Sequence, residues 1–344
     1  MAQLESTSSE LVLDVRSLCV DFDTKSGPVR VLDDISFTLK AGSTLGIVGE
    51  SGCGKSMTAL ALMGLIPSPP GRISGGEILL YGEDLVTAGK KRLRQLRGDK
   101  ISMIFQEPMT SLNPVYSIGN QVSESIIYHQ NVGKKEARER TIELLRLVQI
   151  PAPERRVDEY PHQLSGGMRQ RVMIAMALAC EPSVLIADEP TTALDVTVQA
   201  QIFELLLEIQ KRRDIAIILI SHDMGAIAEL ADDVVVMYAG HKIEEGSAID
   251  VINNPHHPYT QGLLRCMPDI EEDFNKGRQP LFEIVGNVPD LADRGSGCPF
   301  APRCSARFDK CSSLPETLSL QGGRRVKCWL ASDAMALSRG ITDE

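Results

Sequence analysis

The strongest chemical signal in the sequence is a glycine-rich segment, Gly49-Glu50-Ser51-Gly52-Cys53-Gly54-Lys55-Ser56, with the spacing G-x-x-x-x-G-K-S. Glycines let the backbone curl so that successive N–H groups point at one anion, and the positive end of a following helix adds to the attraction. We expect Lys55 to reach the β- and γ-phosphates of a nucleotide and the Ser56 hydroxyl to bind Mg²⁺. The segment predicts a phosphate-binding loop that contains Gly49, Ser51, Gly52, Cys53, Gly54, Lys55 and Ser56.

An acidic pair, Asp188-Glu189, follows the apolar run Val184 to Ala187. Such a run predicts a strand buried on both faces, which places Asp188 at the carboxyl end of the strand, where α/β sheets bind ligands. There Asp188 would hold Mg²⁺, and Glu189 would orient or deprotonate an attacking water. A helix cap is the alternative for an acidic residue at this place, and the glycine-rich loop upstream favours the catalytic interpretation.

Four of the eight cysteines crowd into the end of the chain, at Cys298, Cys304, Cys311 and Cys328, with the spacing C-x5-C-x6-C-x16-C. Four thiolates close together in a reducing compartment suit a [4Fe–4S] cluster or a tetrahedral Zn²⁺. The spacing lacks the C-x2-C pairs usual for structural zinc. Free thiols are the third interpretation.

The apolar patterns predict the elements that must position these residues. Short strands are expected at 11–15, 35–39 and 44–48, and a helix at 56–66 that ends before a group of prolines. The glycine-rich segment therefore lies between a strand and a helix, which is the context a phosphate loop requires.

Further along, the pattern predicts a buried strand–helix–strand unit and a charge-rich helical region. The expected elements are a strand at 101–105, helices within 116–160, an apolar helix at 169–179, strands at 184–187 and 215–220 around a helix at 199–212, and a hairpin at 234–245. The fold class is therefore α/β. Beyond about residue 255 aliphatic runs give way to proline, glycine and cysteine, so we expect a first domain at 1–255 and a small loop-rich extension at 256–344.

Composition excludes several classes of protein. The 344 residues carry a formal net charge of −10, which argues against broad nucleic-acid binding. The N-terminal residues lack the basic and apolar regions of a signal peptide, and no apolar run reaches the ~20 residues of a spanning helix. We expect a soluble cytosolic chain that would need other subunits to cross a membrane.

A local basic cluster from Lys90 to Lys100 indicates a solvated helix face, with a lipid or partner contact as the alternative.

Taken in order, these motifs make residues 11 to 250 resemble the ATP-binding subunit of an ABC transporter. The resemblance implies a P-loop NTPase cassette with a mixed sheet core and a helical subdomain at about 89–180. It also implies that ATP and Mg²⁺ are bound, and that Gln106 contacts Mg²⁺ and senses the transmembrane partner. His222, which follows the 215–220 strand, would contact the γ-phosphate, and Ala193-Leu194-Asp195 would lie between two nucleotide sites.

Two further assignments come from the same resemblance. Leu164-Ser165-Gly166-Gly167-Met168-Arg169-Gln170 matches the family signature, in which Ser165, Gly166 and Gly167 bind the γ-phosphate of ATP held by a second cassette. Without the resemblance, Ser-Gly-Gly would indicate only a helix N-cap. Phe22 is the candidate for stacking on adenine, with a plain core position as the alternative.

The remaining features narrow the resemblance to oligopeptide and dipeptide importers. The stretches carrying it are Gln106 to Pro114, His256 to Leu264, Gly286 to Leu291 and Gly297 to Cys304. In such importers a cysteine quartet is associated with a [4Fe–4S] cluster. The implied partners are a second, related ATPase subunit, two transmembrane permease subunits and an extracytoplasmic solute-binding protein. The chain would then lie peripherally on the cytoplasmic face of the membrane.

Alternatives of other classes remain open at this point. The same machinery could import nickel chelates, glutathione or another small solute. A soluble ABC protein of DNA repair or translation usually has two cassettes or a coiled-coil insertion, which this sequence lacks. A regulatory binder with an inactive site is disfavoured because Lys55, Asp188, Glu189 and His222 are all present.

Overall fold

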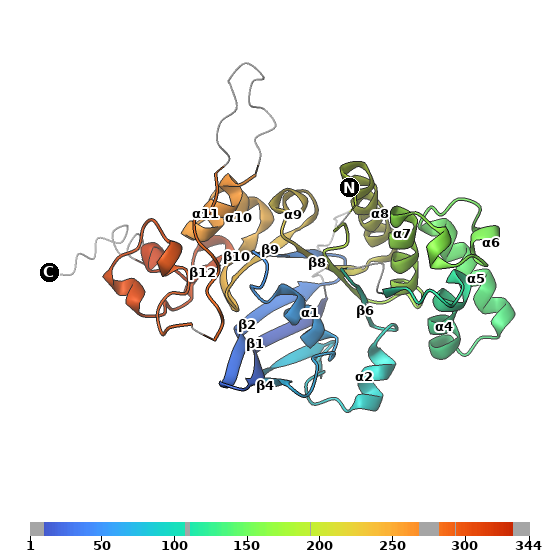
Figure 1. Cartoon of the computed structure of the whole chain (residues 1–344), viewed down its shortest axis with the longest axis horizontal. Helices are drawn as coiled ribbons and strands as arrows, with labels where there is room; N and C mark the ends of the chain where they lie inside the picture. Colours follow the sequence, from blue (N-terminus) through green and yellow to red (C-terminus); the bar gives the residue numbers. More distant parts are fainter. Residues whose placement is uncertain (1–9, 107–110, 193, 268–281, 293, 333–344) are drawn as a thin grey trace, which may run out of the picture.

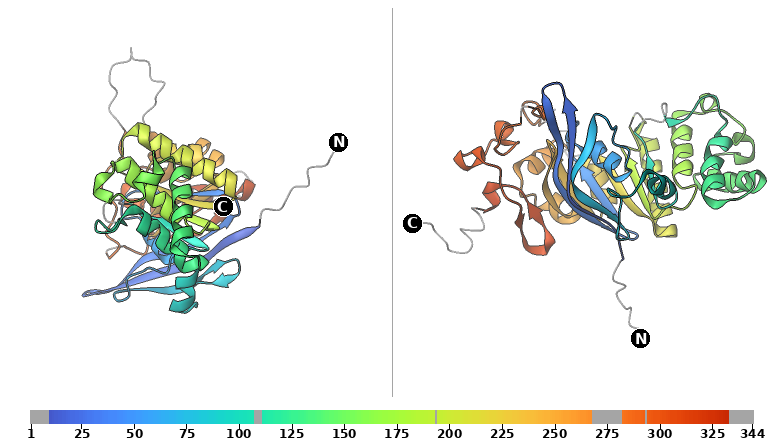
Figure 2. Two further views of the ribbon diagram at one scale, coloured as in Figure 1. Left: turned by 90° about the vertical axis from the view of Figure 1, so that its right-hand side faces the viewer. Right: turned by 90° about the horizontal axis from the view of Figure 1, so that it is seen from below.

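The computed structural model describes residues 10–106, 111–192, 194–267, 282–292 and 294–332. The molecule has three parts along its long axis (Figure 1). Two sheets with helix α1 form the middle, a group of helices that includes α4 to α7 forms one end, and the C-terminal segments form the other. The view from below shows the same order (Figure 2).

The central sheet has eight strands in the order β11-β12-β10-β9-β3-β8-β7-β6. Its inner strands run parallel, with β3 between β8 and β9, and β7 between β8 and β6. The parallel strands are β3 (Thr44–Val48), β6 (Ile101–Ile104), β7 (Val184–Asp188), β8 (Ala216–Ser221) and β9 (Asp233–Tyr238). The strands β10 (His241–Ser247), β11 (Leu318–Ser319) and β12 (Arg325–Val326) add antiparallel pairs at one edge.

A second, antiparallel sheet has the order β2-β1-β4-β5. Its strands are β1 (Leu11–Thr24), β2 (Gly27–Lys40), β4 (Gly71–Leu80) and β5 (Glu83–Asp84). Strands β1 and β2 are much longer than the predicted 11–15 and 35–39 because further buried residues, among them Leu18, Val20 and Leu32, continue the core. Charged pairs follow beyond them. Asp21 pairs with Arg30 at 3.0 Å, and Asp23 pairs with Arg72 at 2.6 Å.

The central sheet has a separate hydrophobic core on each face. Alternate residues such as Ile186 and Ile218 pack with the antiparallel sheet and α1 (Lys55–Leu62). Their neighbours Leu185 and Leu219 pack with the helices on the other side. Because both faces are buried, the strands are continuously aliphatic, as the sequence predicts. The predicted α/β class is confirmed.

The helical end contains α4 (Ile118–Gln130), α5 (Lys134–Leu147), α6 (Pro153–Arg156) and α7 (Gly166–Ala177). The predicted helical region at 116–160 is divided where Asn131 and Ala152 adopt left-handed φ angles of 52° and 51°. Helix α7 begins earlier than the predicted 169 because the Ser165 side chain accepts the Met168 N–H and caps it. The Asp195 side chain likewise caps α8 (Val196–Arg213).

The C-terminal segments pack onto the cassette through an aromatic cluster. Helices α9 (Met224–Leu230), α10 (Ala248–Asn253) and α11 (Pro258–Arg265) precede them. Tyr238 of β9 lies edge-on to Tyr259 of α11 and to Phe300, with ring centroids 4.7 and 5.3 Å apart. Strand β12 pairs with β10 through Glu244 and Val326. The residues after 255 therefore share the core and the sheet of the residues before it.

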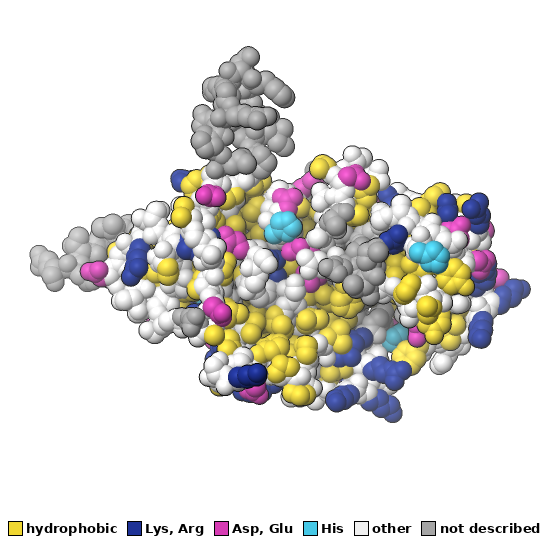
Figure 3. All heavy atoms as spheres, in the orientation of Figure 1, with side chains coloured by type: hydrophobic (Ala, Val, Ile, Leu, Met, Phe, Trp, Pro, Cys, Tyr) yellow, Lys and Arg dark blue, Asp and Glu magenta, His cyan; other side chains and the backbone are white. Residues whose placement is uncertain are grey.

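Basic side chains gather over helix α2 (Lys90–Leu96) in the space-filling view (Figure 3). Arg92 forms two hydrogen bonds of 2.7 Å to Glu83. Arg97, which follows α2, donates to the carbonyls of Met63 and Gly64 at 2.6 and 2.5 Å. Part of this cluster thus holds α2 to the cassette.

None of the helices in the described ranges combines the length and apolarity that a bilayer crossing needs.

Candidate functional site

The predicted catalytic residues meet at one edge of the central sheet. Strands β3, β6, β7 and β8 are parallel neighbours in the sheet, so their carboxyl ends lie side by side. The glycine-rich loop follows β3, Gln106 follows β6, Asp188 ends β7 and His222 follows β8. Residues far apart in the sequence are thus brought to one place, as expected for ligand binding in α/β sheets.

The glycine-rich loop has a conformation that requires glycine at two positions. Gly54 has a φ of 108°, and a Cβ there would lie 2.7 Å from the Leu32 side chain. At Gly49 a Cβ would lie 2.3 Å from the Met237 carbonyl oxygen. The loop is also tied to the turn after β9, because Gly240 N–H donates to the Cys53 carbonyl at 2.9 Å. The curled loop predicted from the sequence is therefore present and is held by this hydrogen bond.

Lys55, the first residue of α1, turns its ammonium group back over the loop. Its Nζ donates to the carbonyls of Gly49 at 2.7 Å and Glu50 at 3.2 Å. The side chain is buried, with only 6% of the residue exposed. A buried cation inside a loop of glycines is suited to bind the phosphate oxygens of a nucleotide.

Ser56 and Asp188 provide hard oxygen donors beside this lysine. The Ser56 hydroxyl donates to Asp188 Oδ1 at 3.2 Å. Burial raises the pKa of the Asp188 carboxyl above its usual value, a rise that the Ser56 hydrogen bond opposes and the Glu189 carboxylate increases. A buried carboxylate with a neighbouring hydroxyl matches the oxygen ligands that Mg²⁺ prefers. The described residues therefore fit the predicted Mg²⁺ position.

Glu189 is the centre of a small polar network. Its Oε2 accepts from Gln106 Nε2 at 2.8 Å and from the Thr192 hydroxyl at 2.9 Å, and its Oε1 lies 3.4 Å from His222 Nδ1. Its backbone has a left-handed φ of 45°, and its N–H donates to Ile220. The structure thus brings together the three predicted catalytic residues. Sequence reasoning did not find Thr192, although its place three residues after Glu189 was a local signal.

The signature residues lie apart from this group. Ser165 and Gly166 are exposed at the start of α7, and a Cβ on Gly167 would lie 3.0 Å from Val198 of α8. Figure 1 places α7 with the helical end and α1 in the middle of the molecule. Within one chain Ser165 acts as the helix cap of α7. Its predicted contact with a nucleotide on a partner stays a prediction, and Ala193 of the neighbouring motif lies outside the described residues.

Phe22 is half-buried on β1. It pairs with Val29 and with Gly71, and a Cβ on Gly71 would lie 2.8 Å from the end of the Phe22 ring. The side chain also packs against the core between the two sheets. Core packing accounts for these contacts, and stacking on adenine stays a prediction.

The four tail cysteines lie near one another. Burial raises the pKa of Cys298 and Cys304, and the nearby Cys311 adds to both rises; burial also raises the pKa of Cys328 to about 11. Cys298 N–H donates to the Cys311 carbonyl at 3.0 Å. Within the described ranges, however, no three His, Cys, Asp or Glu side chains form a group that could hold a metal ion. The predicted cluster or zinc site therefore stays a prediction.

Cys53 offers a test of how tightly the loop is packed. Its side chain is fully buried, and burial raises the pKa of its thiol. Because the thiolate is the reactive form, we expect iodoacetamide to label Cys53 roughly tenfold or more slowly than the exposed Cys266. Timed labelling of the native protein followed by peptide mass spectrometry measures both rates. In denaturant the two thiols should react alike, and equal rates in the native protein would contradict the packing.

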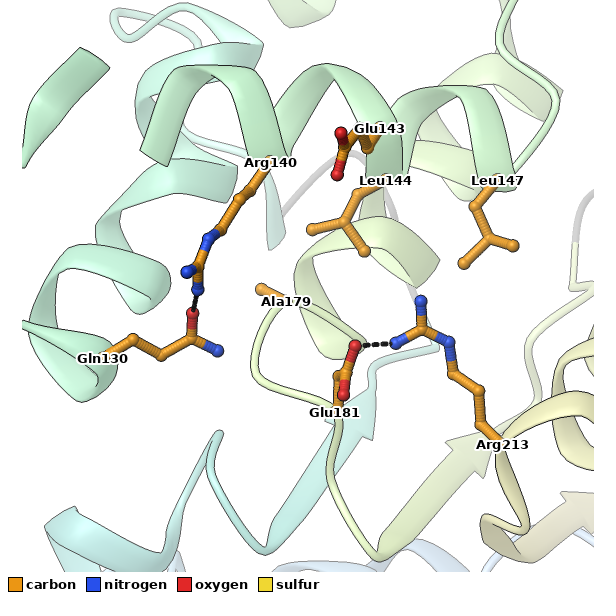
Figure 4. Close-up of a pocket in the computed structure, with 8 residues that line it drawn as sticks. All are labelled: Gln130, Arg140, Glu143, Leu144, Leu147, Ala179, Glu181 and Arg213. Atoms are coloured by element: carbon orange, nitrogen blue, oxygen red, sulfur yellow. Dashed lines mark hydrogen bonds and ion pairs between the residues drawn. The ribbon is translucent and has the colours of Figure 1, made fainter. Parts of the chain in front are cut away.

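A separate pocket of about 220 Å³ lies between the helical end and the end of α8 (Figure 4). Two of its arginines bind within the lining, Arg213 to Glu181 and Arg140 to Gln130. The pocket contains none of the predicted site residues. The sheet edge therefore remains the candidate active site.

The sequence matches two described families. Residues 32–192 match the family described as ABC transporter, and residues 243–311 match the C-terminal region of oligopeptide/dipeptide transporters. The chain is 52% identical to the dipeptide transport ATP-binding protein DppD of Haemophilus influenzae, over 92% of this chain and 94% of the relative. It is 50% identical to the protein of that name in Escherichia coli, over 92% and 96% of the two chains.

Solved structures resemble the cassette part of the chain. A bacterial ABC transporter cassette solved as a dimer superposes with a TM-score of 0.62 at 26% identity, over 69% of this chain and 98% of that one. The cbiO1 protein of Clostridium perfringens, part of the ABC transporter complex cbiONQ, gives a TM-score of 0.60 at 31% identity, over 71% and 92% of the chains.

Proposed function

Because the chain belongs to the ABC transporter family, among the ATP-binding proteins with the oligopeptide/dipeptide transporter C-terminal region, we propose that it is the ATPase subunit that powers peptide import. The observation that carries the proposal is the meeting of Lys55, Asp188 and Glu189 at the sheet edge. The names of the relatives support peptides as the transported class, since they describe dipeptide transport and peptide import.

The residues at the sheet edge divide between nucleotide binding and hydrolysis. The loop amides and Lys55 bind the phosphates, while Ser56, Asp188 and Gln106 would hold the Mg²⁺ that neutralises phosphate charge. Glu189 accepts a proton from a water molecule while the oxygen of that water attacks the γ-phosphorus. The bond between the γ-phosphorus and the bridging oxygen breaks, which releases ADP. Gln106, Thr192 and His222 hold the Glu189 carboxylate in place for this step.

We further propose that two cassettes close face to face around two ATP molecules. The exposure of Ser165 and Gly166 supports this arrangement, since both are free to meet a ligand outside their own chain. The dimeric state of a similar solved cassette supports it as well. The partner cassette, two membrane-spanning permease subunits and a solute-binding protein would complete a transporter in which this chain lies peripherally on the cytoplasmic face.

The proposed function is tested on the native complex. The tagged chain is purified from membranes in mild detergent, its partners are identified by mass spectrometry, and the complex is reconstituted into vesicles. We expect permease subunits to copurify and ATP hydrolysis to rise when a peptide-loaded binding protein is added. A complex that hydrolyses ATP but responds only to a non-peptide solute would overturn the peptide assignment, and a complex without ATPase activity would overturn the enzyme assignment.

We also propose the cysteine quartet as a site for a [4Fe–4S] cluster, with Zn²⁺ as the alternative. Thiolate chemistry and the closeness of the four thiols support the proposal, whereas their placement among the described residues does not form a metal group. Iron, sulfide and zinc analysis of the protein purified without oxygen distinguishes the two. We expect about one cluster per chain, and protein without bound metal would rule out both.

A further inference from the structure

Glu50, the second residue of the phosphate loop, is held by two residues from beyond position 255. The Tyr259 hydroxyl of α11 accepts the Glu50 N–H at 2.8 Å. The Arg303 guanidinium donates to both oxygens of the Glu50 carboxylate, at 2.5 and 3.1 Å. The C-terminal segments therefore bind both the backbone and the side chain of one residue of the nucleotide site.

Arg303 is held in position by further hydrogen bonds within the chain. It also donates to the carbonyls of Ile284 and Val285 at 2.8 and 3.1 Å and to the Tyr238 hydroxyl at 3.3 Å. Only 6% of its side chain is exposed, whereas 26% of the Glu50 side chain is exposed. A buried guanidinium held by neutral acceptors and paired in two-pronged fashion with one carboxylate is a well-oriented charge pair.

Glu50 carries a negative charge in a loop that is proposed to bind a negatively charged nucleotide. An uncompensated carboxylate in this loop would repel the phosphates. Because 26% of the Glu50 side chain is exposed, salt would screen part of this repulsion. Glu50 also touches the lysine of the site, since its carbonyl accepts from Lys55 Nζ at 3.2 Å. The position of the Glu50 peptide and the position of the Lys55 ammonium are therefore linked.

We propose that Arg303 and Tyr259 are positioning residues of the nucleotide site, through which the C-terminal extension sets the ATP affinity of the cassette. Arg303 neutralises the Glu50 carboxylate, and Tyr259 keeps the Glu50 N–H turned toward α11. The inference rests on the proposed function that this loop binds ATP. It adds a dependence of that binding on segments that lie outside the nucleotide motifs.

The experiment measures ATP and ADP binding by calorimetry, with Mg²⁺, on the full chain and its variants. We expect Arg303→Met to weaken ATP binding about tenfold, which is the order expected for one charge left uncompensated near the ligand. The loss should be smaller for ADP, which carries less charge, and should shrink at high ionic strength. The matched control is Arg307→Met, an exposed arginine of the same extension, which should bind ATP like the wild type.

A double variant separates charge neutralisation from a merely structural role. If Arg303 acts by neutralising Glu50, adding Glu50→Gln to Arg303→Met should restore most of the ATP affinity. If Arg303 only holds the extension together, the double variant should bind as weakly as Arg303→Met, and this result would overturn the inference. Equal ATP affinity of Arg303→Met and wild type would overturn it as well.

Two further variants cover the case in which Arg303→Met does not fold. Arg303→Lys keeps the charge and should retain most of the affinity, and Glu50→Gln alone should bind ATP at least as tightly as wild type. Weaker binding by Glu50→Gln would contradict the role given to its charge. Wild-type protein that binds no ATP would instead refute the proposed function, so the two failures are distinguishable.

Discussion

Replacing Glu189 with glutamine is expected to leave ATP binding nearly unchanged and to lower turnover by about 10² to 10⁴. The amide oxygen of glutamine can still accept from Gln106 and Thr192, which now bind Glu189 Oε2 at 2.8 and 2.9 Å. An amide cannot accept a proton from the attacking water, so the chemical step alone is lost. Binding is measured by calorimetry and turnover by phosphate release from the reconstituted complex.

The matched control for this variant is Glu229→Gln, an exposed carboxylate on α9. It should turn over ATP at the wild-type rate. If Glu189→Gln also hydrolyses ATP at nearly that rate, the proton acceptor is another group and the assignment of Glu189 is wrong. If it loses ATP binding, the carboxylate has a structural role in the pocket instead.

Replacing Lys55 with alanine is expected to weaken ATP binding roughly a hundredfold, a loss of about 3 kcal/mol. The ammonium is the buried cation of the loop, and its loss removes charge-assisted contacts to the phosphates. It also removes the hydrogen bonds to Gly49 and Glu50 that hold the loop together. Calorimetry on the full chain gives the affinity, and hydrolysis should be lost in proportion at low ATP.

Thermal unfolding of the same variant distinguishes loss of a ligand contact from loss of the fold. The control is Lys211→Ala on α8, an exposed lysine that should change neither measurement. A folded Lys55→Ala protein with wild-type ATP affinity would refute the phosphate-binding role. A variant that fails to fold would show that the two loop hydrogen bonds matter more for stability than we expect.

Much of the site could be predicted from the sequence because its motifs are local. The glycine-rich loop needs particular residue types at fixed spacing, and its strand and helix lie directly beside it in the chain. The apolar runs around Ile186 and Ile218 likewise predict buried parallel strands, which the two-sided core confirms. Asp188 was found because it ends such a strand, where α/β sheets bind ligands, whereas His222 was assigned from the family resemblance.

Local patterns were less informative where polar residues extend or end an element. The pairing of β1 and β2 continues beyond the predicted ranges because Leu18 and Val20 are also buried in the core, and because Asp21 and Asp23 find arginine partners on neighbouring strands. These arginine partners lie on other strands, Arg30 on β2 and Arg72 on β4, which a local pattern of residues does not reveal. The start of α7 is different, because its cap joins Ser165 to Met168 within one turn, and Ser-Gly-Gly in the sequence already indicates such a cap.

By itself the sequence determined the residue types of the nucleotide site, their order and the buried strands that carry them, because these depend on short-range spacing and apolar pattern. Only the tertiary structure decided which groups act on one another. It brought Thr192 and His222 into contact with Glu189, and it left Ser165 exposed at the start of α7. It also set Arg303 on Glu50, 253 positions earlier in the chain, because a hydrogen bond depends on distance in space and not on separation in sequence.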